Sequence, residues 1–268
     1  MAVINWDELW KTKLLSTYRI KLCQTSYWDK CAVSFNQKTI QMQDLTKSQL
    51  DRINLRPEYT VIDIGAGTGR LTIPLAKQVK QVTAVEPSTS MLSLLKSNAE
   101  KANIQNIVPL NISCEQITVN ENLFPHDVVV ASFSLFMSNL SKTLQKLDSL
   151  ATKNVYLFSS ASRWISEELQ KIISGEPLPF TCGDYIYIYN ILHELGILAN
   201  VEVWNFESKQ YFTDLNAAVA RFMETYRIAT NHEEDLKSYL RKILTIENGN
   251  LLLKQQKKAA VIWWTKTE

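Results

Sequence analysis

Glycine is scarce in this chain, with only seven among 268 residues. Three of the seven, Gly65, Gly67 and Gly69, nevertheless fall within one short window. A residue without a Cβ is required where the backbone adopts conformations closed to other residues, or where a ligand approaches the main chain closely. The sequence therefore directs the search for a functional site to this window.

The chain also lacks an excess of charge of either sign. It has 29 basic and 27 acidic residues, which leaves a formal net charge of +2. Proteins that bind nucleic acid or a membrane surface usually show a larger basic excess. The composition thus does not favour a nucleic-acid or membrane partner, although a local basic patch is compatible with it.

Paired cysteines and long apolar runs are lacking as well. No two cysteines form a Cys-x-x-Cys pair and none has a histidine at metal-ligand spacing, which predicts reduced thiols and no metal site. No stretch approaches the roughly 18 apolar residues that span a bilayer. Asp7 and Glu8 stand where a secretory signal is apolar. We therefore expect a soluble cytoplasmic protein, whose cysteines are Cys23, Cys31, Cys114 and Cys182.

From residue 60 onward, short apolar runs alternate with helical patterns, which is typical of a parallel sheet wound with helices. The run 127–132 (DVVVAS) is the clearest buried strand, because consecutive apolar residues suit a strand covered on both faces. The expected strands are 60–64, 81–85, 107–112, 127–132 and 155–160, and the expected helices are 71–79, 88–102 and 140–151. We predict a Rossmann-like, doubly wound, mostly parallel α/β sheet of seven strands, the last one antiparallel.

The flanking segments differ from this core. Residues 1–50 form a predicted N-terminal helical cap, and 162–247 form an insert that is long for a mere connection and is expected to be a helical substrate lid. The insert has helical patterns at 215–228 and 233–246 and a strand pattern at 201–206. The apolar runs 251–253 and 259–264, joined by polar residues 254–258, predict a terminal hairpin within 248–268 that completes the sheet.

One further pattern lies in the insert. Tyrosine and isoleucine alternate over 185–189, which indicates a strand or an aromatic stripe that lines a pocket. Packing in the core is the commoner role for such residues.

The glycine window has a defined context. Residues 61–71 (VIDIGAGTGRL) form a predicted strand that runs into a tight turn and then a helix, whose first N–H groups are unpaired. At the end of the next strand, Glu86 is placed to accept hydrogen bonds from both ribose hydroxyls of a nucleoside. Strand, three glycines, helix, strand and terminal acid in this order predict a nucleoside-cofactor site.

The glycine spacing separates two kinds of cofactor. Dinucleotide binders use GxGxxG, with a pyrophosphate at the helix N-terminus. Here the pattern is GxGxG, and Asp63 stands two positions before the first glycine. A carboxylate beside the turn repels a pyrophosphate but suits a ligand with an ammonium or sulfonium group. The sequence thus favours S-adenosylmethionine and disfavours a nicotinamide oxidoreductase.

VIDIGAGTGRL followed by VTAVEPSTSML resembles the first two motifs of class I S-adenosylmethionine-dependent methyltransferases, over about residues 58–161. The resemblance implies an S-adenosylmethionine-binding core at 51–161, with S-adenosylhomocysteine as the product. By position, Glu86 would hold the ribose. The turn around the methionine part would comprise Asp63, Gly65, Ala66, Gly67, Thr68 and Gly69, and the residues bordering adenine would be Pro87, Ser88 and Met91. For Met91, core packing is an equal alternative.

The other candidates implied by the resemblance lie at strand ends and in the cap. Family members commonly carry an Asp-Ala-Glu-like stretch after the third strand, whose acid contacts adenine. Here that place holds Ser113, Cys114 and Glu115, so the acidic contact is missing or comes from Glu115. After the fourth strand, Ser132 and Phe133 would face the methyl group and the acceptor. The run 26–30 resembles the aromatic helix that closes over the cofactor, with Tyr27 or Trp28 as its lid residue.

The sequence indicates less about the methyl acceptor than about the cofactor. Methyl transfer from a sulfonium is an in-line displacement that depends on placing the acceptor, and a general base is needed only if the acceptor loses a proton, so we name no catalytic residue. The base-reading motif of amino-methylating enzymes, Asn or Asp followed by two prolines and an aromatic residue, is replaced by ASFS at 131–134. This favours a small-molecule acceptor. The alternatives are an RNA or protein acceptor, or a non-catalytic cofactor-binding partner protein, and the oligomeric state stays open.

Overall fold

The computed structural model describes residues 4–15, 18–162, 164–175 and 183–266. Within these residues, eight strands belong to one sheet. They are β1 (Thr60–Ile64), β2 (Gln81–Val85), β3 (Ile107–Leu110), β4 (His126–Ser132), β5 (Ala151–Ser160), β6 (Asn200–Phe212), β7 (Leu244–Glu247) and β8 (Asn250–Thr265).

The sheet has a parallel part and an antiparallel part. Strands in the order β3-β2-β1-β4-β5 are parallel to their neighbours. β8 then pairs antiparallel with β5 on one side and with β6 on the other, and the short β7 pairs with β8 alone. The predicted Rossmann-like sheet, with its antiparallel last strand, is confirmed. β7 is an additional strand that the sequence did not indicate.

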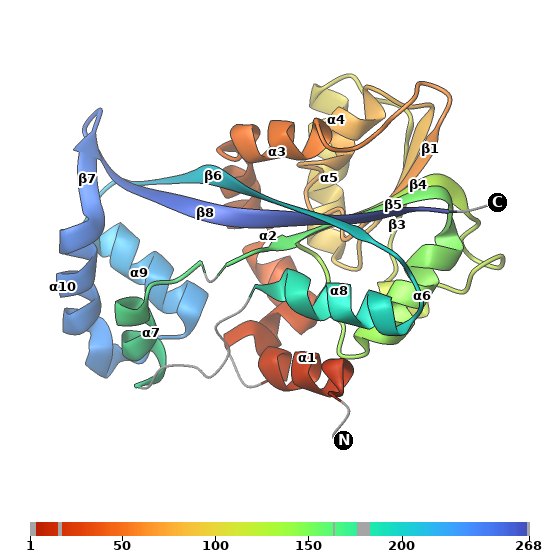
Figure 1. Cartoon of the computed structure of the whole chain (residues 1–268). Coiled ribbons are helices and arrows are strands. Elements are labelled where there is room, and N and C mark those ends of the chain that lie inside the picture. The colour runs from red at the N-terminus through yellow and green to blue at the C-terminus, as the bar shows by residue number, and fades with distance from the viewer. Residues whose placement is uncertain (1–3, 16–17, 163, 176–182, 267–268) are drawn as a thin grey trace.

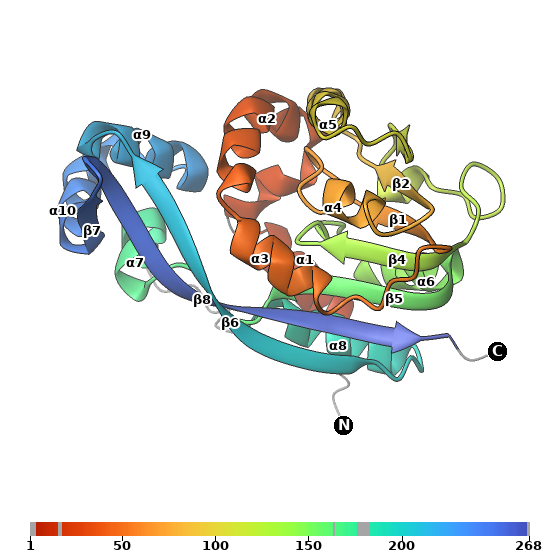
Figure 2. The same cartoon turned by 90° about the horizontal axis from the view of Figure 1, so that it is seen from above.

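Helices cover both faces of this sheet (Figures 1 and 2). α1, α6 and α8 bury their apolar residues against one face, and α3 and α4 pack against the other. The helices are α1 (Trp6–Leu15), α2 (Thr25–Ile40), α3 (Gln43–Leu50), α4 (Thr72–Ala76), α5 (Thr89–Lys101), α6 (Leu140–Leu150), α7 (Glu167–Ser174), α8 (Asp184–Glu194), α9 (Leu215–Tyr226) and α10 (Glu233–Ile243). Short 3-10 helices are η1 (Tyr18–Cys23), η2 (Cys114–Gln116) and η3 (Thr230–His232).

The alternation of side chains along the central strands explains the uninterrupted apolar runs. On β1, Val61 belongs to the cluster under α3 and α4, whereas Ile62 belongs to the cluster under α1, α6 and α8. On β4, Val128 and Val129 divide in the same way. Because successive strand residues point to opposite faces, a strand with helices on both sides needs apolar residues at consecutive positions.

A second hydrophobic cluster lies away from the parallel strands. The paired β6 and β8 extend as a two-stranded ribbon to a group of three helices (Figure 2). There Leu169 of α7, Phe222 of α9, Leu236 of α10 and Leu253 of β8 are buried together. We call α7, α9, α10, β7 and the adjoining ends of β6 and β8 the distal lobe.

A buried lysine of the N-terminal cap forms hydrogen bonds with the distal lobe. Lys21 of η1 is 2% exposed, and its ammonium donates hydrogen bonds to the backbone carbonyls of Glu224, at 2.9 Å, and Thr225. Both carbonyls belong to the last turn of α9, where carbonyls lack helical partners and a cation is favoured. Burial lowers the pKa of Lys21. The contact joins segments far apart in the sequence.

The predicted terminal hairpin is wrong in the position of its turn. Residues 254–258 lie inside the continuous β8, where they pair with 205–209 of β6. The turn instead lies between β7 and β8, at Asn248 and Gly249, which both have positive φ angles (51° and 77°). Asparagine and glycine tolerate this conformation better than other residues do. Lys257 is therefore a strand residue and not part of a solvated turn.

The strand alternative for 185–189 is also wrong, because these residues form part of α8. Tyr187 is buried, with its ring centroid 5.9 Å from that of Trp10 in α1. Tyr189 points to the other side of the helix and is exposed. Tyr187 thus serves the packing of α8 on α1, whereas Tyr189 does not.

Two sequence expectations concern composition. Cys23, Cys31 and Cys114 are free thiols, and Cys182 lies outside the described residues. Among the helices that the structure describes, none is long and apolar enough to cross a membrane.

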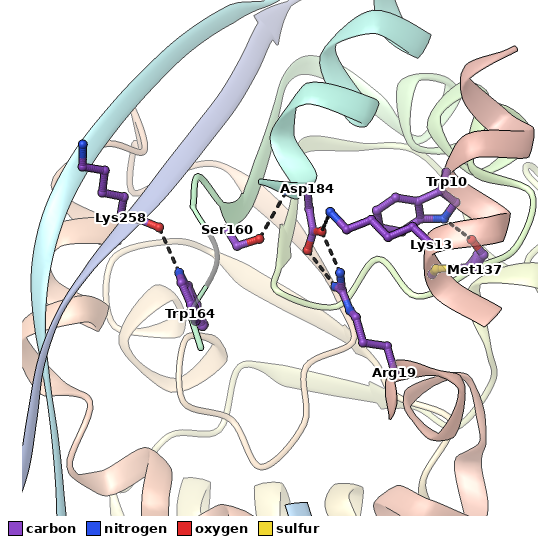
Figure 3. Close-up of polar contacts among 8 residues, drawn as sticks. All are labelled: Trp10, Lys13, Arg19, Met137, Ser160, Trp164, Asp184 and Lys258. Atoms are coloured by element: carbon purple, nitrogen blue, oxygen red, sulfur yellow. Dashed lines mark hydrogen bonds and ion pairs between the residues drawn. The ribbon is translucent and has the colours of Figure 1, made fainter. Parts of the chain in front are cut away.

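One buried carboxylate holds the cap to α8 (Figure 3). Asp184, the first residue of α8, accepts two hydrogen bonds from Arg19, each 2.7 Å long, and lies 2.9 Å from the ammonium of Lys13. The preceding Gly183 is required because a Cβ there would lie 2.5 Å from the carbonyl oxygen of Ser160. Burial alone would raise the pKa of Asp184, but the two cations hold that pKa well below its usual range.

We expect Asp184→Asn to lower the free energy of unfolding by about 3 to 5 kcal/mol at pH 7, because it removes the negative charge that faces the buried Lys13 and the partly buried Arg19. Since the folded-state pKa is depressed, the contribution of Asp184 is present above the unfolded-state pKa of about 4 and is lost as pH falls through the folded value. Urea unfolding at pH 7 measures the change. The control is Asp235→Asn, because that side chain is 70% exposed. A loss no larger than that of the control would refute the role of Asp184.

Candidate functional site

The glycine turn lies at the carboxyl edge of the parallel strands. The N–H groups of Gly65 and Ala66 donate to the carbonyl of Val85, at 2.8 and 3.1 Å, which ties the turn to the end of β2. Gly65 has a φ of +71°, and a Cβ there would lie 2.4 Å from the Cβ of Ser134. A larger residue would therefore displace either the turn or the segment after β4. The sequence requires glycine here for both conformation and space.

Glu86 is held in place by the turn. One of its carboxylate oxygens accepts a hydrogen bond from the N–H of Gly67 at 2.9 Å, and the other accepts one from the N–H of Ser88 at 2.8 Å. Burial raises the pKa of Glu86, and the two backbone donors oppose that shift. The carboxylate thus has a fixed orientation before any ligand arrives.

Asp63 lies beneath the turn as a buried charge. It is 2% exposed and accepts a hydrogen bond from the hydroxyl of Thr72 at 2.6 Å. Burial raises the pKa of Asp63 to about 6, against the opposing effects of Thr72 and the charge of Arg70. Near neutral pH it therefore adds negative charge beside the turn, and this charge is removed by mild acid.

A polar cluster adjoins Asp63 at the end of β4. The hydroxyl oxygen of Ser132 accepts hydrogen bonds from the guanidinium of Arg70 at 2.7 Å and from the side-chain amide of Gln49 at 2.9 Å. Arg70 also donates to the hydroxyl of Thr46 at 2.8 Å. With two donors already bound, Ser132 keeps its own hydroxyl proton for a further acceptor.

Helix α2 covers this edge of the sheet with aromatic residues. The ring of Trp28 lies 5.5 Å from Phe35 and is stacked at 6.2 Å on Phe136. The helix is anchored by Asp29, which accepts hydrogen bonds from the hydroxyl of Ser88 at 2.6 Å and the N–H of Ser90 at 3.0 Å. These bonds lower the pKa of Asp29. The position of α2 agrees with the helix expected to close over the cofactor.

A cavity of about 270 Å³ lies between the strand ends, the glycine turn and α2. Ten of the candidate residues from the sequence line it, from four separate segments of the core. They are Gly65, Gly67, Glu86, Pro87, Met91, Ser113, Cys114, Glu115, Ser132 and Phe133.

Six candidates do not line the cavity. Asp63 and Ala66 are buried, and Ser88 caps the N-terminus of α5 with its side chain. Thr68 and Gly69 line a separate open groove. Tyr27 packs against Trp28, with ring centroids 5.2 Å apart, and of these two lid candidates only Trp28 lines the cavity.

Several lining residues were missed by the sequence patterns. Phe35 follows Trp28 by seven residues, which is two helical turns, and this spacing is a signal that was available. Arg70 follows the glycine motif directly. For Lys38, Met42 and Phe136 no local motif exists, because their placement depends on how the cap packs on the core.

Trp164 closes the cavity on the side of the distal lobe. Its ring lies 5.1 Å from that of Phe133 and 5.7 Å from that of Phe206, and its indole N–H donates to the carbonyl of Lys258 at 3.0 Å (Figure 3). The three rings form a continuous aromatic series from the end of β4 to the ribbon. Phe133 itself has a φ of +54°, an uncommon conformation for a bulky residue and one that marks many functional sites.

The described residues contain no group of three or more histidine, cysteine, aspartate or glutamate side chains arranged to hold a metal ion.

The residues of the cavity fit a nucleoside that carries a cationic tail. The turn leaves its main chain open to close approach, Glu86 presents an oriented carboxylate, and Asp63 places further negative charge nearby. Pro87 and Met91 supply apolar surface next to Glu86. A pyrophosphate would be repelled by the Glu86 carboxylate in the cavity and by the nearby buried charge of Asp63.

Comparison with known proteins agrees with this assignment. The family model for ribosomal RNA adenine dimethylases matches residues 29–123. An uncharacterized protein from Haemophilus influenzae is 29% identical over 97% of this chain and 96% of its own length. The ribosomal RNA small subunit methyltransferase A of Wigglesworthia glossinidia brevipalpis is 26% identical over 40% of this chain and 45% of that enzyme.

Solved structures share the fold. A candidate methyltransferase from Bacillus halodurans superposes with a TM-score of 0.56 at 14% identity, over 83% of this chain and 99% of that one. The magnesium protoporphyrin IX methyltransferase of Synechocystis, solved with bound S-adenosylhomocysteine, gives a TM-score of 0.50 at 15% identity, over 85% and 83%. The strand order, the glycine turn and these matches lead to one conclusion: the chain has the fold of class I S-adenosylmethionine-dependent methyltransferases, and its cofactor side is similar to that of ribosomal RNA adenine dimethylases.

Proposed function

We propose that the protein transfers a methyl group from S-adenosylmethionine to a small molecule that binds between the core and the distal lobe. The observation that carries this proposal is the enclosure of the acceptor side. Beyond Ser132 and Phe133, the cavity is bordered by Trp28, Lys38 and Trp164, and it adjoins a cleft of about 90 Å³ against the ribbon. Small-molecule sites are concave and largely apolar, with a few polar groups.

Each side of the cavity has a proposed role. Glu86 would hold the ribose, Gly65 and Gly67 would admit the methionine part, and Asp63 would favour its ammonium group. The adenine would lie against Pro87 and Met91, and the acid at the end of β3 would be Glu115. When bound, S-adenosylmethionine supplies a methyl group on a cationic sulfur. The remaining candidates for the cofactor side are Ala66, Thr68, Gly69, Ser88, Ser113, Cys114 and Tyr27.

On the acceptor side, the protein's task is to position a nucleophile and exclude water. Phe133 and Trp164 would hold an apolar or aromatic part of the acceptor. The hydroxyl proton of Ser132 would be donated to a polar atom of the ligand, because Ser132 already accepts from Arg70 and Gln49. We assign no general base.

A ribosomal RNA acceptor is the second candidate, because the matched family model carries that description. The match covers 29–123, which is the cap from within α2 onward, the glycine turn and the first three strands. It ends before β4, so it does not extend to Ser132 and Phe133, where an acceptor would lie. The similarity to this family model is therefore on the cofactor side.

Removing the Glu86 carboxylate tests the cofactor side. We expect Glu86→Ala to weaken the binding of S-adenosylhomocysteine by about 10- to 150-fold. This factor corresponds to the free energy that a hydrogen bond to a charged group contributes. Isothermal titration calorimetry gives the affinities. Glu100→Ala, an exposed change on α5, is the matched control and should leave affinity unchanged. Unchanged affinity in Glu86→Ala would contradict the ribose role.

The titration of Asp63 predicts a pH dependence of cofactor binding. With a free-protein pKa of about 6, Asp63 is mostly ionised at pH 7 and mostly protonated at pH 5, so the affinity for S-adenosylmethionine should fall about tenfold between them. Burial raises the pKa of Glu86 as well, which adds a change in the same direction. Asp63→Asn separates the two: it should bind about tenfold more weakly at pH 7 and show a flatter profile. If the affinity of the variant depended on pH in the same way as that of the unchanged protein, the pH dependence would not come from Asp63.

The acceptor class is tested by methyl transfer itself. Radiolabelled S-adenosylmethionine is offered with a panel of small aromatic and heterocyclic acids, amines and alcohols, and in parallel with unmodified ribosomal RNA. We expect label in a small acceptor, and Phe133→Ala to lower that transfer at least tenfold while cofactor affinity stays within about threefold. Transfer of the labelled methyl group to RNA alone would contradict the small-molecule proposal and favour an RNA acceptor.

A further inference from the structure

The cleft next to the cofactor cavity lies on one face of the β6–β8 ribbon. Because side chains alternate along a strand, the residues of β8 at 253, 255 and 257 face the cleft, opposite those of β6 at 206, 208 and 210. Helix α9 of the distal lobe and Lys38 of α2 form the other walls. Lys38, Met42 and Trp164 line both the cleft and the cofactor cavity, so the two spaces adjoin each other.

Positive charge gathers in this cleft. Lys38, Lys209, Arg221 and Lys257 line it from four different elements, and no aspartate or glutamate lines it among the residues that the structure describes. The ammonium of Lys257 lies 5.3 Å from the centre of the Trp164 ring. Lys257 therefore lies beside the ring that closes the cofactor cavity, and Lys38 lines the cleft and that cavity alike.

The charges of Lys38 and Lys257 are not neutralised by the described part of the chain. Neither ammonium has a carboxylate within 4 Å there, whereas the neighbouring Lys254 lies 2.9 Å from Glu207. Arg221 has Glu224 at 3.3 Å and also donates to the hydroxyl of Ser34. Burial lowers the pKa of Lys257 to about 8, and the neighbouring charge of Lys38 adds to the effect.

Cations kept close together without a counter-charge destabilise the folded state unless a ligand supplies that charge. The geometry points to the cleft as the binding site for an anionic group of the methyl acceptor, a carboxylate or a phosphate, held by Lys38, Arg221 and Lys257. The apolar or aromatic part of the acceptor then lies against Phe133 and Trp164, next to the cofactor cavity. This inference rests on the proposed function, because it identifies the ligand of the cleft as the acceptor.

The experiment titrates the protein, saturated with S-adenosylhomocysteine, with small aromatic probes by isothermal titration calorimetry at pH 7. The anionic probes are benzoate and phenyl phosphate, and benzyl alcohol and benzylamine are the neutral and cationic ones. We expect the anions to bind at least tenfold more tightly than the other two. The tighter of the two anions then identifies the class of charged group.

Variants locate the binding. Lys257→Gln and Arg221→Gln should each weaken the preferred anion at least tenfold. The matched control is Lys258→Gln, because Lys258 is the next residue of β8 and its side chain points away from Trp164 (Figure 3). The control should bind the anion within twofold of the unchanged protein. If Lys257→Gln proves unstable in thermal unfolding, Arg221→Gln, which alters a different element, carries the test.

The outcomes separate this inference from the proposed function. Absence of S-adenosylhomocysteine binding would refute the proposed function. Normal binding of that cofactor, with anionic and neutral probes bound alike or with Lys258→Gln as damaging as Lys257→Gln, would refute the anion site alone. A labelled RNA hairpin that competes with phenyl phosphate and is weakened at least tenfold by Lys257→Gln would also overturn it, in favour of a nucleic-acid acceptor.

Discussion

The antiparallel pairing of β8 with β5 and β6 is the interaction on which both parts of the molecule depend. Near its end, β8 buries Ile262 and Trp264 in the core under α1, α6 and α8, and near its start it buries Leu253 in the distal lobe. Because the strand is continuous, the distal lobe cannot shift without disturbing the sheet. The proposed acceptor cleft lies between these two anchored ends. Its shape is therefore set by strand pairing more than by contacts within the lobe.

Buried charges are paired with opposite charges away from the cavity but are incompletely paired beside it. Asp184 has two cations in direct contact, which satisfies it within the chain. Asp63 has one hydroxyl donor and no cation within 4 Å among the described residues, and its pKa is raised. Paired charges hold segments together, whereas incompletely paired ones cost stability and are typical of binding sites. The distribution of satisfied and unsatisfied charges thus marks the cavity independently of any motif.

The core strands and the glycine turn were predictable because their signals are local. A strand such as 127–132 is covered on both faces, so its apolar residues are consecutive in the sequence. Residues 254–258 gave the opposite result. Their strand has a polar cleft on one face and solvent on the other, so neither face is apolar and the segment resembles a loop. The strand alternative for 185–189 was wrong because alternating tyrosine and isoleucine also suits a helix packed on one side and open on the other.

The sequence by itself determined the parallel strands, the glycine turn and the cofactor class, because a backbone conformation and the acids beside it depend on residues near one another in the chain. The tertiary structure alone decided which residues surround the acceptor. Lys38, Phe133, Trp164, Arg221 and Lys257 come from five separate segments and share no spacing. They meet only because the ribbon carries the distal lobe back toward α2 and the strand ends, and no local pattern records a contact made by long-range packing.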